Sequence, residues 1–201
     1  METERAGTMP VIKSKATYED LVEVPDNLVA EIVDGNLHTS PRPASRHTLA
    51  QSSLQTLIGG PFQQGVGGPG GWWILSEPEL HLRDAVVVPD VAGWRRERMP
   101  EYPDAPWFSL APDWLCEVAS PSTERFDRVE KLRVYAGAGV GHVWLVNPLN
   151  QTIEIYRRDG TAWTLVSAHA GNAVIHAAPF EAVPLELGRL WDAPPAAGTV
   201  K

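Results

Sequence analysis

The fold is decided by the stretch Asp113-Trp114-Leu115-Cys116-Glu117-Val118-Ala119, followed by Ser120-Pro121-Ser122-Thr123 and a helical run that ends at glycines. Another apolar run, His142 to Asn147, comes directly after this helix. The pattern predicts a strand–helix–strand unit, which within one sheet forms a right-handed parallel crossover. Glu117 stands inside the first strand, where a buried carboxylate is costly unless it is paired, hydrogen-bonded or bound to a metal.

A second strand carries a carboxylate in a similar apolar setting. Val86-Val87-Val88-Pro89-Asp90-Val91 places Asp90 among valines, and we expect one strand from Ala85 to Trp94. A further long strand is expected before it, from Trp72 to Leu82. Two acidic strands of this kind indicate a site that uses both carboxylates.

The crossover helix returns a lysine toward Glu117. The strand continues from Glu117 for three residues, roughly 10 Å at the rise of a strand. The helix then runs back over the sheet for nine residues to Lys131, roughly 13 Å at helical rise. Lys131 should therefore lie near the level of Glu117, with Asp127 one turn earlier on the same face.

The remaining pattern extends these elements into one mixed α/β domain over 17–192, with a central mixed sheet flanked by helices. Residues 1–16 are expected to be a flexible leader and 193–201 a flexible tail. The other expected elements are a helix at 18–23 capped by Thr17, a hairpin at 28–40 around Asp34-Gly35, a helix at 45–58 capped by Ser45, a flexible loop at 59–71, an irregular segment at 95–112, and strands at 152–158, 161–168 and 183–187.

The composition is that of an ordinary soluble domain. The chain has 201 residues, of which 43% are hydrophobic and 21% charged, so disorder is not expected. It lacks both a membrane-length apolar run and a secretory signal, and we expect no membrane association. Its single cysteine, Cys116, excludes an intrachain disulfide, so the cytoplasm is the simplest location.

The net charge of −8 argues against broad binding to nucleic acid, which depends on Lys and Arg neutralising phosphates. A local basic groove remains compatible with this charge. Two clusters could form one: Arg95, Arg96 and Arg98, and then Arg125, Arg128, Lys131 and Arg133.

The candidate site suits a hard divalent cation. Mg²⁺ takes oxygen ligands and keeps several waters, and Asp90, Glu117 and the backbone carbonyl of Val118 could supply three protein oxygens. Mg²⁺ or Mn²⁺ fits this donor set better than Zn²⁺, which prefers Cys and His. Lys131 could orient or deprotonate the attacking water, or neutralise charge that develops on a phosphate.

An ordered set of motifs carries a family resemblance. Its members are Glu31 within Glu-Ile-Val-Asp-Gly, His47 at a helix start, Val-Val-Pro-Asp-Val at 87–91, Glu-Val-Ala-Ser-Pro-Ser-Thr at 117–123, Asp127, Lys131, Tyr135, Ala-Gly-Val at 138–140 and Trp-Leu-Val-Asn-Pro at 144–148. Between Tyr18 and Trp191 the chain resembles the restriction endonuclease family often called Uma-two, of the PD-(D/E)XK nuclease superfamily. The resemblance implies a restriction-endonuclease-like fold and metal-dependent cleavage of DNA.

Carried over residue by residue, the resemblance assigns a role to each candidate. Asp90 matches the aspartate of the PD motif and Glu117 the following acidic residue. The lysine expected two residues later is Ala119, and Lys131 on the next helix matches its displaced counterpart. The resemblance also implies a catalytic role for the early glutamate, Glu31, while His47 and Asp127 are accessory candidates. Asn147 departs from the family pattern, which often has Asp there, and so does Val143, where Tyr is frequent.

Simpler interpretations stand beside each assignment. Asp90 could form a turn, Glu117 could pair with an arginine such as Arg133, and Lys131 could pair only with Asp127. Glu31 could form a salt bridge in the hairpin. At the level of the whole chain, a catalytically inactive nuclease-fold binding module and a partner-binding structural domain are the alternatives to a nuclease. A homodimer is expected, since one site per chain would then cut both DNA strands.

Overall fold

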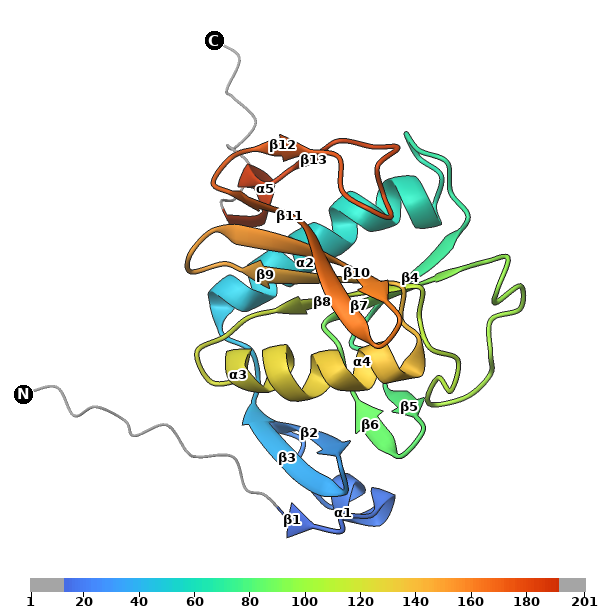
Figure 1. The fold of residues 1–201 in the computed structure, drawn as a ribbon, viewed down its shortest axis with the longest axis vertical. Coiled ribbons are helices and arrows are strands. Elements are labelled where there is room, and N and C mark those ends of the chain that lie inside the picture. The colour runs from blue at the N-terminus through green and yellow to red at the C-terminus, as the bar shows by residue number, and fades with distance from the viewer. Residues whose placement is uncertain (1–12, 192–201) are drawn as a thin grey trace, which may run out of the picture.

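The computed structural model describes residues 13–191 and contains two main sheets with helices packed on the larger one (Figure 1). The larger sheet has six strands in the order β11 (Ala162–Ala170), β10 (Thr152–Asp159), β9 (His142–Asn147), β8 (Trp114–Val118), β7 (Val91–Arg95) and β4 (Trp72–Ser76). The smaller sheet has five, in the order β1 (Lys13–Ser14), β3 (Asn36–Pro41), β2 (Leu28–Val33), β6 (Ala85–Val87) and β5 (Leu80–Leu82). The architecture is the expected α/β restriction-endonuclease-like core.

Helices cover both faces of the larger sheet. On one face α2 (Ser45–Ile58) and α5 (Gly188–Trp191) pack on strand residues such as Trp114 and Trp144. On the other face lies the crossover helix, which consists of α3 (Glu124–Phe126), the π-helix η2 (Asp127–Lys131) and α4 (Leu132–Ala138). Its Tyr135 packs with Leu115 and Leu145. The alternation of side chains along β8 therefore directs Glu117 toward the crossover helix.

The expected strand–helix–strand unit is present. β8 pairs with β9 in parallel, with Glu117 opposite Leu145, and the crossover helix connects the two strands. Gly139 ends the helix with φ +91°, a left-handed conformation that glycine adopts at little cost. The site residues of this unit are therefore fixed by local topology.

Two segments that we expected to be single strands are each divided between the sheets. The segment 72–82 is β4 followed by β5, and 85–94 is β6 followed by β7. The breaks fall at Glu77-Pro78 and at Val88-Pro89-Asp90, where proline cannot donate to a strand ladder. Asp90 thus lies at the point where the chain passes from the smaller sheet to the larger one.

Several element ends also differ from the sequence expectation. α2 begins at Ser45, but its N-cap is Ala44 and no side chain caps the helix. The loop expected at 59–71 opens with the π-helix η1 (Gly59–Gln63), which buries Pro61 and Phe62. Tertiary packing therefore extends order into a segment whose glycines indicate flexibility.

Near its two ends the chain differs from expectation as well. The expected leader, 1–16, is too long, because Lys13–Ser14 pairs with β3. The two-stranded sheet of β12 (Val174–Ile175) and β13 (Leu185–Glu186) and the helix α5 were not fully anticipated. Most of the leader and all of the expected tail lie outside the described residues.

Other expectations hold. Thr17 caps α1 (Tyr18–Val22) in a capping box with Asp20. The β2–β3 hairpin turns at Asp34-Gly35, both with positive φ. Within residues 13–191, no helix is long and apolar enough to cross a bilayer.

Candidate active site

All the predicted site residues line one cavity of about 250 Å³. They are Glu31, His47, Asp90, Glu117, Val118, Asp127 and Lys131. They come from β2, α2, the break between β6 and β7, β8 and the crossover helix. Residues spread over 101 positions of the sequence, from Glu31 to Lys131, thus meet at the junction of the two sheets.

Lys131 is the centre of the buried half of the cavity. Its Nζ lies 2.9 Å from Glu117 Oε1 and 2.8 Å from Glu31 Oε1, and it donates to the carbonyl of Val88 at 3.2 Å. An ammonium group has three protons, so these contacts use all of them. Burial alone would lower the pKa of Lys131, but Glu117 and Glu31 outweigh it and raise the pKa above its ordinary value. Lys131 is therefore a fixed cation and a poor base.

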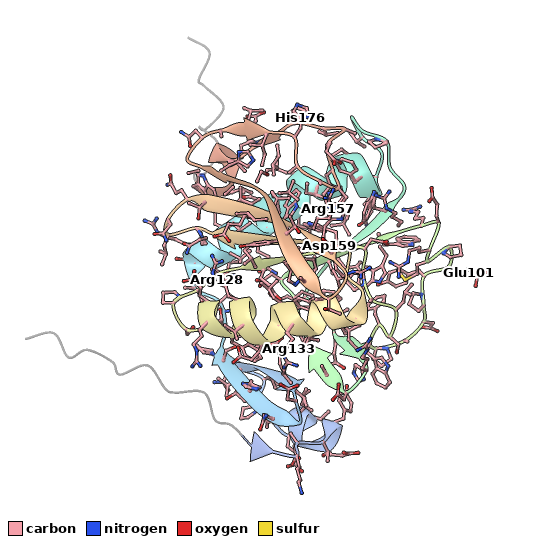
Figure 2. The ribbon with its side chains drawn as sticks, in the orientation of Figure 1. Glu101, Arg128, Arg133, Arg157, Asp159 and His176 are labelled. Carbon is pink, nitrogen blue, oxygen red and sulfur yellow. The ribbon has the colours of Figure 1, made fainter. Side chains whose placement is uncertain are left out.

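Glu117 is held by the crossover helix from two positions. Tyr135 Oη donates to its Oε1 at 2.5 Å, and Lys131 contacts the same oxygen. Burial raises the pKa of Glu117 well above its usual range; Lys131 opposes this, and Asp127 and Asp90 add to it. The alternative pairing of Glu117 with Arg133 does not occur: Arg133 lies on the crossover helix (Figure 2) and pairs with Asp34.

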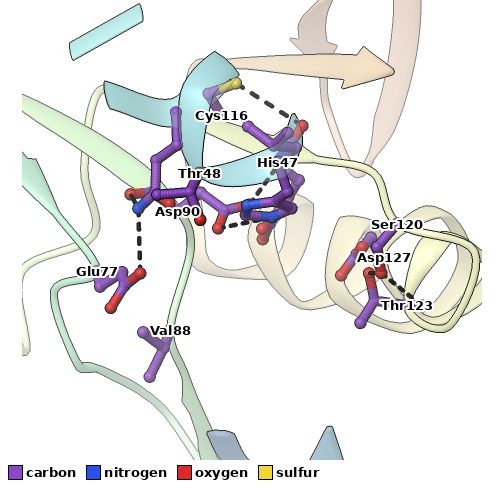
Figure 3. A network of polar contacts seen from close by, with 12 residues as sticks. His47, Thr48, Glu77, Val88, Asp90, Cys116, Ser120, Thr123 and Asp127 are labelled. Carbon is purple, nitrogen blue, oxygen red and sulfur yellow. Dashed lines mark hydrogen bonds and ion pairs between the residues drawn. The ribbon is translucent and has the colours of Figure 1, made fainter. Parts of the chain in front are cut away.

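Asp90 occupies the more open half of the cavity. Its Oδ2 accepts a hydrogen bond of 2.7 Å from the backbone N–H of Val118, and its Oδ1 lies 3.2 Å from His47 Nε2 (Figure 3). The Asp90 side chain is 14% exposed, compared with 3% for Glu117. Both residues line the same cavity, Asp90 on its more exposed side.

Glu31 does not form the simple hairpin salt bridge considered from the sequence. Its Oε1 accepts a 2.8 Å hydrogen bond from the N–H of Val88 and also contacts Lys131. Glu31 and Lys131 thereby hold both backbone polar groups of Val88, two residues before Asp90. In this structure Glu31 fixes the chain that carries Asp90, which is a positioning role.

Asp127 and Lys131 lie on the π-helical turn η2. Such turns commonly occur at functional sites. Asp127 Oδ1 lies 3.8 Å from Lys131 Nζ, the longest of the carboxylate contacts to this lysine. Burial raises the pKa of Asp127 to about 6, although Lys131 lowers it. A pairing of Lys131 with Asp127 alone is therefore too limited a description of the site.

His47 lies at the start of α2 and faces Asp90. Its side chain is 8% exposed, and its Nδ1 has no hydrogen-bond partner among the described residues. Burial lowers the pKa of His47, but the hydrogen bond and charge of Asp90 outweigh burial and raise it overall. Since an ionised carboxylate only accepts, Nε2 carries the proton in this contact.

The donor set fits a hard divalent cation by its chemistry. Four carboxyl groups, from Glu31, Asp90, Glu117 and Asp127, line the cavity, and its basic side chains are Arg42, His47 and Lys131. Among residues 13–191, however, no group of three or more His, Cys, Asp or Glu side chains is placed to hold a metal. A cation held by Asp90 and Glu117 would therefore also need backbone or water oxygens.

Several side chains of the two basic clusters are engaged within the described part of the chain. Arg98 pairs with Asp113, Arg128 with Glu124 and Glu154, and Lys131 is buried among carboxylates. Arg96 donates to the carbonyls of Trp72 and Gln63. Figure 2 shows Arg128 and Arg133 on the crossover helix, where their charge is already compensated.

Two residues that contact the site were not among our candidates. Tyr135 belongs to the stripe Asp127, Lys131, Tyr135, whose spacing of four residues could have indicated it. Gln51 on α2 donates to the carbonyl of Asp90 at 3.0 Å. It lies four residues after His47, a spacing that the sequence also shows.

The two sheets and the parallel crossover, with the carboxylate–lysine cluster between them, define a protein with a restriction-endonuclease-like fold. A family model, Uma2, described as "Putative restriction endonuclease", matches residues 16–187. The chain belongs to this family. It is also similar to a crystal structure of "a putative nuclease belonging to DUF820" from Anabaena variabilis ATCC 29413, with a TM-score of 0.70 and 21% sequence identity, over 88% of this chain and 97% of that one. None of the curated proteins matches the chain.

Proposed function

We propose that the protein is a Mg²⁺- or Mn²⁺-dependent endonuclease that hydrolyses phosphodiester bonds in DNA through a PD-(D/E)XK-type site. The observation that supports this most is that Asp90, Glu117 and Lys131 line the same cavity. Membership of the family described as "Putative restriction endonuclease" points to the same reaction and to DNA as the substrate.

In this proposal Asp90, Glu117 and the carbonyl of Val118 would hold the cation. When bound, it would supply Lewis acidity toward the phosphate and make a bound water more acidic. Lys131 keeps Glu117 in place and offsets negative charge beside the reacting phosphate, since its contacts leave no proton-accepting role. Tyr135 fixes the Glu117 oxygen that Lys131 also contacts.

The test is cleavage of supercoiled plasmid DNA by purified protein with Mg²⁺ or Mn²⁺ and with a chelator. We expect metal-dependent nicking that Asp90→Asn and Glu117→Gln abolish. Arg133→Gln, on the exposed part of the crossover helix, is a matched control that should cut like the wild type. Nicking that survives both site variants would exclude this site as the source of activity.

The alternative is a catalytically inactive nuclease-fold binding module. It is favoured by the net charge of −8 and by the ion pairs that engage Arg98, Arg128 and Arg133. It predicts no heat of Mn²⁺ binding in calorimetry and no cleavage of duplex or single-stranded nucleic acid. Measured binding of Mn²⁺ together with cleavage would rule it out.

We also propose a homodimer, because one site per chain would then act on each DNA strand. Light scattering at working concentration should give about twice the 22.0 kDa mass of the chain. A monomeric mass in the presence of DNA would contradict the dimer without affecting the proposed chemistry.

A further inference from the structure

The segment that carries Asp90 belongs to neither sheet. β6 ends at Val87 and β7 begins at Val91, so Val88-Pro89-Asp90 forms the passage between them. Outside a strand ladder, a residue has no regular backbone partners to hold it. The position of the Asp90 carboxylate therefore depends on the contacts made by neighbouring elements.

One helix supplies two of these contacts. Gln51 Nε2 donates to the carbonyl of Asp90 at 3.0 Å, and His47 Nε2 lies 3.2 Å from Asp90 Oδ1. His47 and Gln51 are one turn apart on the same face of α2. α2 thus contacts both the backbone carbonyl and the side-chain carboxylate of Asp90.

Gln51 also binds the other passage between the sheets. Its Nε2 lies 3.2 Å from Glu77 Oε1, and the N–H of Glu77 donates to the same Asp90 carbonyl at 3.0 Å. Glu77 follows β4 directly, where the chain leaves the larger sheet. The side-chain amide of Gln51 therefore connects the two segments that pass between the sheets.

A polar residue at this position needs a physical reason. Gln51 is 7% exposed and lies on a helix that also buries His47 and the apolar Ala50, Leu54 and Ile58. Burying an amide is costly unless it is hydrogen-bonded, whereas leucine or methionine would fill the same space without that requirement. The two contacts to Asp90 and Glu77 account for a glutamine here.

We propose that Gln51, together with His47, is a positioning residue that holds Asp90 in the geometry needed to bind a divalent cation. This inference rests on the proposed function. Partners of ligand residues commonly change metal affinity or activity by about 10–100-fold when they are removed. Gln51 acts through the Asp90 backbone, so its loss changes affinity without removing an oxygen ligand.

The test is Mn²⁺ binding measured by calorimetry on the full chain. Gln51→Met removes the donors and keeps the length of the side chain, and we expect it to weaken Mn²⁺ binding about tenfold. Gln55→Met is the matched control: Gln55 lies one turn further along α2 and accepts a hydrogen bond from Ser76, but it does not contact Asp90. It should bind Mn²⁺ like the wild type.

An NMR measurement separates positioning from general loss of stability. The N–H of Val118 donates to Asp90 Oδ2, so its amide resonance reports on the carboxylate without metal. Gln51→Met should shift this resonance and speed its exchange with solvent, and Gln55→Met should not. If Gln51→Met does not fold, the pair His47→Ala and His47→Gln decides, because only glutamine keeps a donor toward Asp90.

Each outcome has a distinct meaning. Wild-type affinity in Gln51→Met, equal weakening in Gln55→Met, or equal affinity in the two His47 variants would overturn the positioning role alone. A wild-type chain that binds no Mn²⁺ and cuts no DNA would overturn the proposed function, and this inference with it.

Discussion

The two carboxylates at the centre of the cavity are held in different ways. Glu117 lies on a regular strand, is 3% exposed, and shares one oxygen between Lys131 and Tyr135. Asp90 lies between strands, is 14% exposed, and is held by a backbone amide and a histidine. The buried half therefore contributes to stability and fixes geometry, while the open half can meet a ligand.

The largest loss of stability should come from removing the positive charge of Lys131 from the buried half of the cavity. Lys131→Met leaves Glu31 and Glu117 buried without their partner, and breaking a buried ion pair from one side costs about 3–5 kcal/mol. Urea unfolding should show this loss. Arg133→Met, whose pair with Asp34 is exposed, should change stability by no more than about 0.5 kcal/mol. A small effect of Lys131→Met on stability would mean that water reaches the cluster and solvates its carboxylates.

Tyr135→Phe should have a smaller effect of the same kind. It removes the hydroxyl that donates to Glu117, and hydrogen bonds to charged groups contribute about 1.5–3 kcal/mol. The ring itself is fully buried and stays, so packing is retained. Unfolding measured alongside Tyr156→Phe, whose hydroxyl contacts the partly exposed Glu154, gives the matched comparison.

Asp127→Asn should stabilise the protein at neutral pH. The folded state raises the pKa of Asp127 from 3.8 to about 6, mainly by burial. Between these values the folded protein binds more protons than the unfolded chain, so this group lowers stability as the pH rises through that window. At pH 8 we expect a gain of about 1–2 kcal/mol, and a flatter stability profile between about pH 4 and 6. A loss of stability at pH 8 would show that ionised Asp127 supports Lys131.

Asp90→Asn should have the smallest effect on stability, within about 1 kcal/mol, because asparagine keeps an oxygen for the Val118 amide. Its effect on Mn²⁺ binding should be a complete loss within the range of calorimetry. This combination is the sharpest contrast with Lys131→Met. A large loss of stability in Asp90→Asn would mean that Asp90 contributes to stability as the residues of the buried half do.

The sequence was most informative where neighbours in the chain become neighbours in the site. The crossover brought Lys131 to Glu117 as expected, because strand and helix rises determine that distance locally. Tyr135 followed the same spacing but was left out of the candidates. The hairpin at Asp34-Gly35 was also predictable, since its turn residues tolerate positive φ.

The sequence failed where pairing between distant segments decides the structure. Apolar runs at 72–82 and 85–94 resemble continuous strands, and only Pro78 and Pro89 indicate the breaks between the sheets. The position of Gln51 against Asp90 depends on how α2 packs on the larger sheet, which periodicity does not specify. The expected cap of α2 by Ser45 was wrong as well, since the N-cap is Ala44 and no side chain caps the helix.

The π-helical turn Asp127–Lys131 sets the spacing of two site residues along the crossover helix. A π-turn holds one residue more than the α-helical turn it replaces. Deleting Val129 would restore regular helical bonding and bring Asp127 and Lys131 to a spacing of three residues on the same face. The distance between these two side chains would then change, although every site residue would still be present in the chain. The number of residues in this turn therefore determines the site geometry, just as the identities of the carboxylates determine its chemistry.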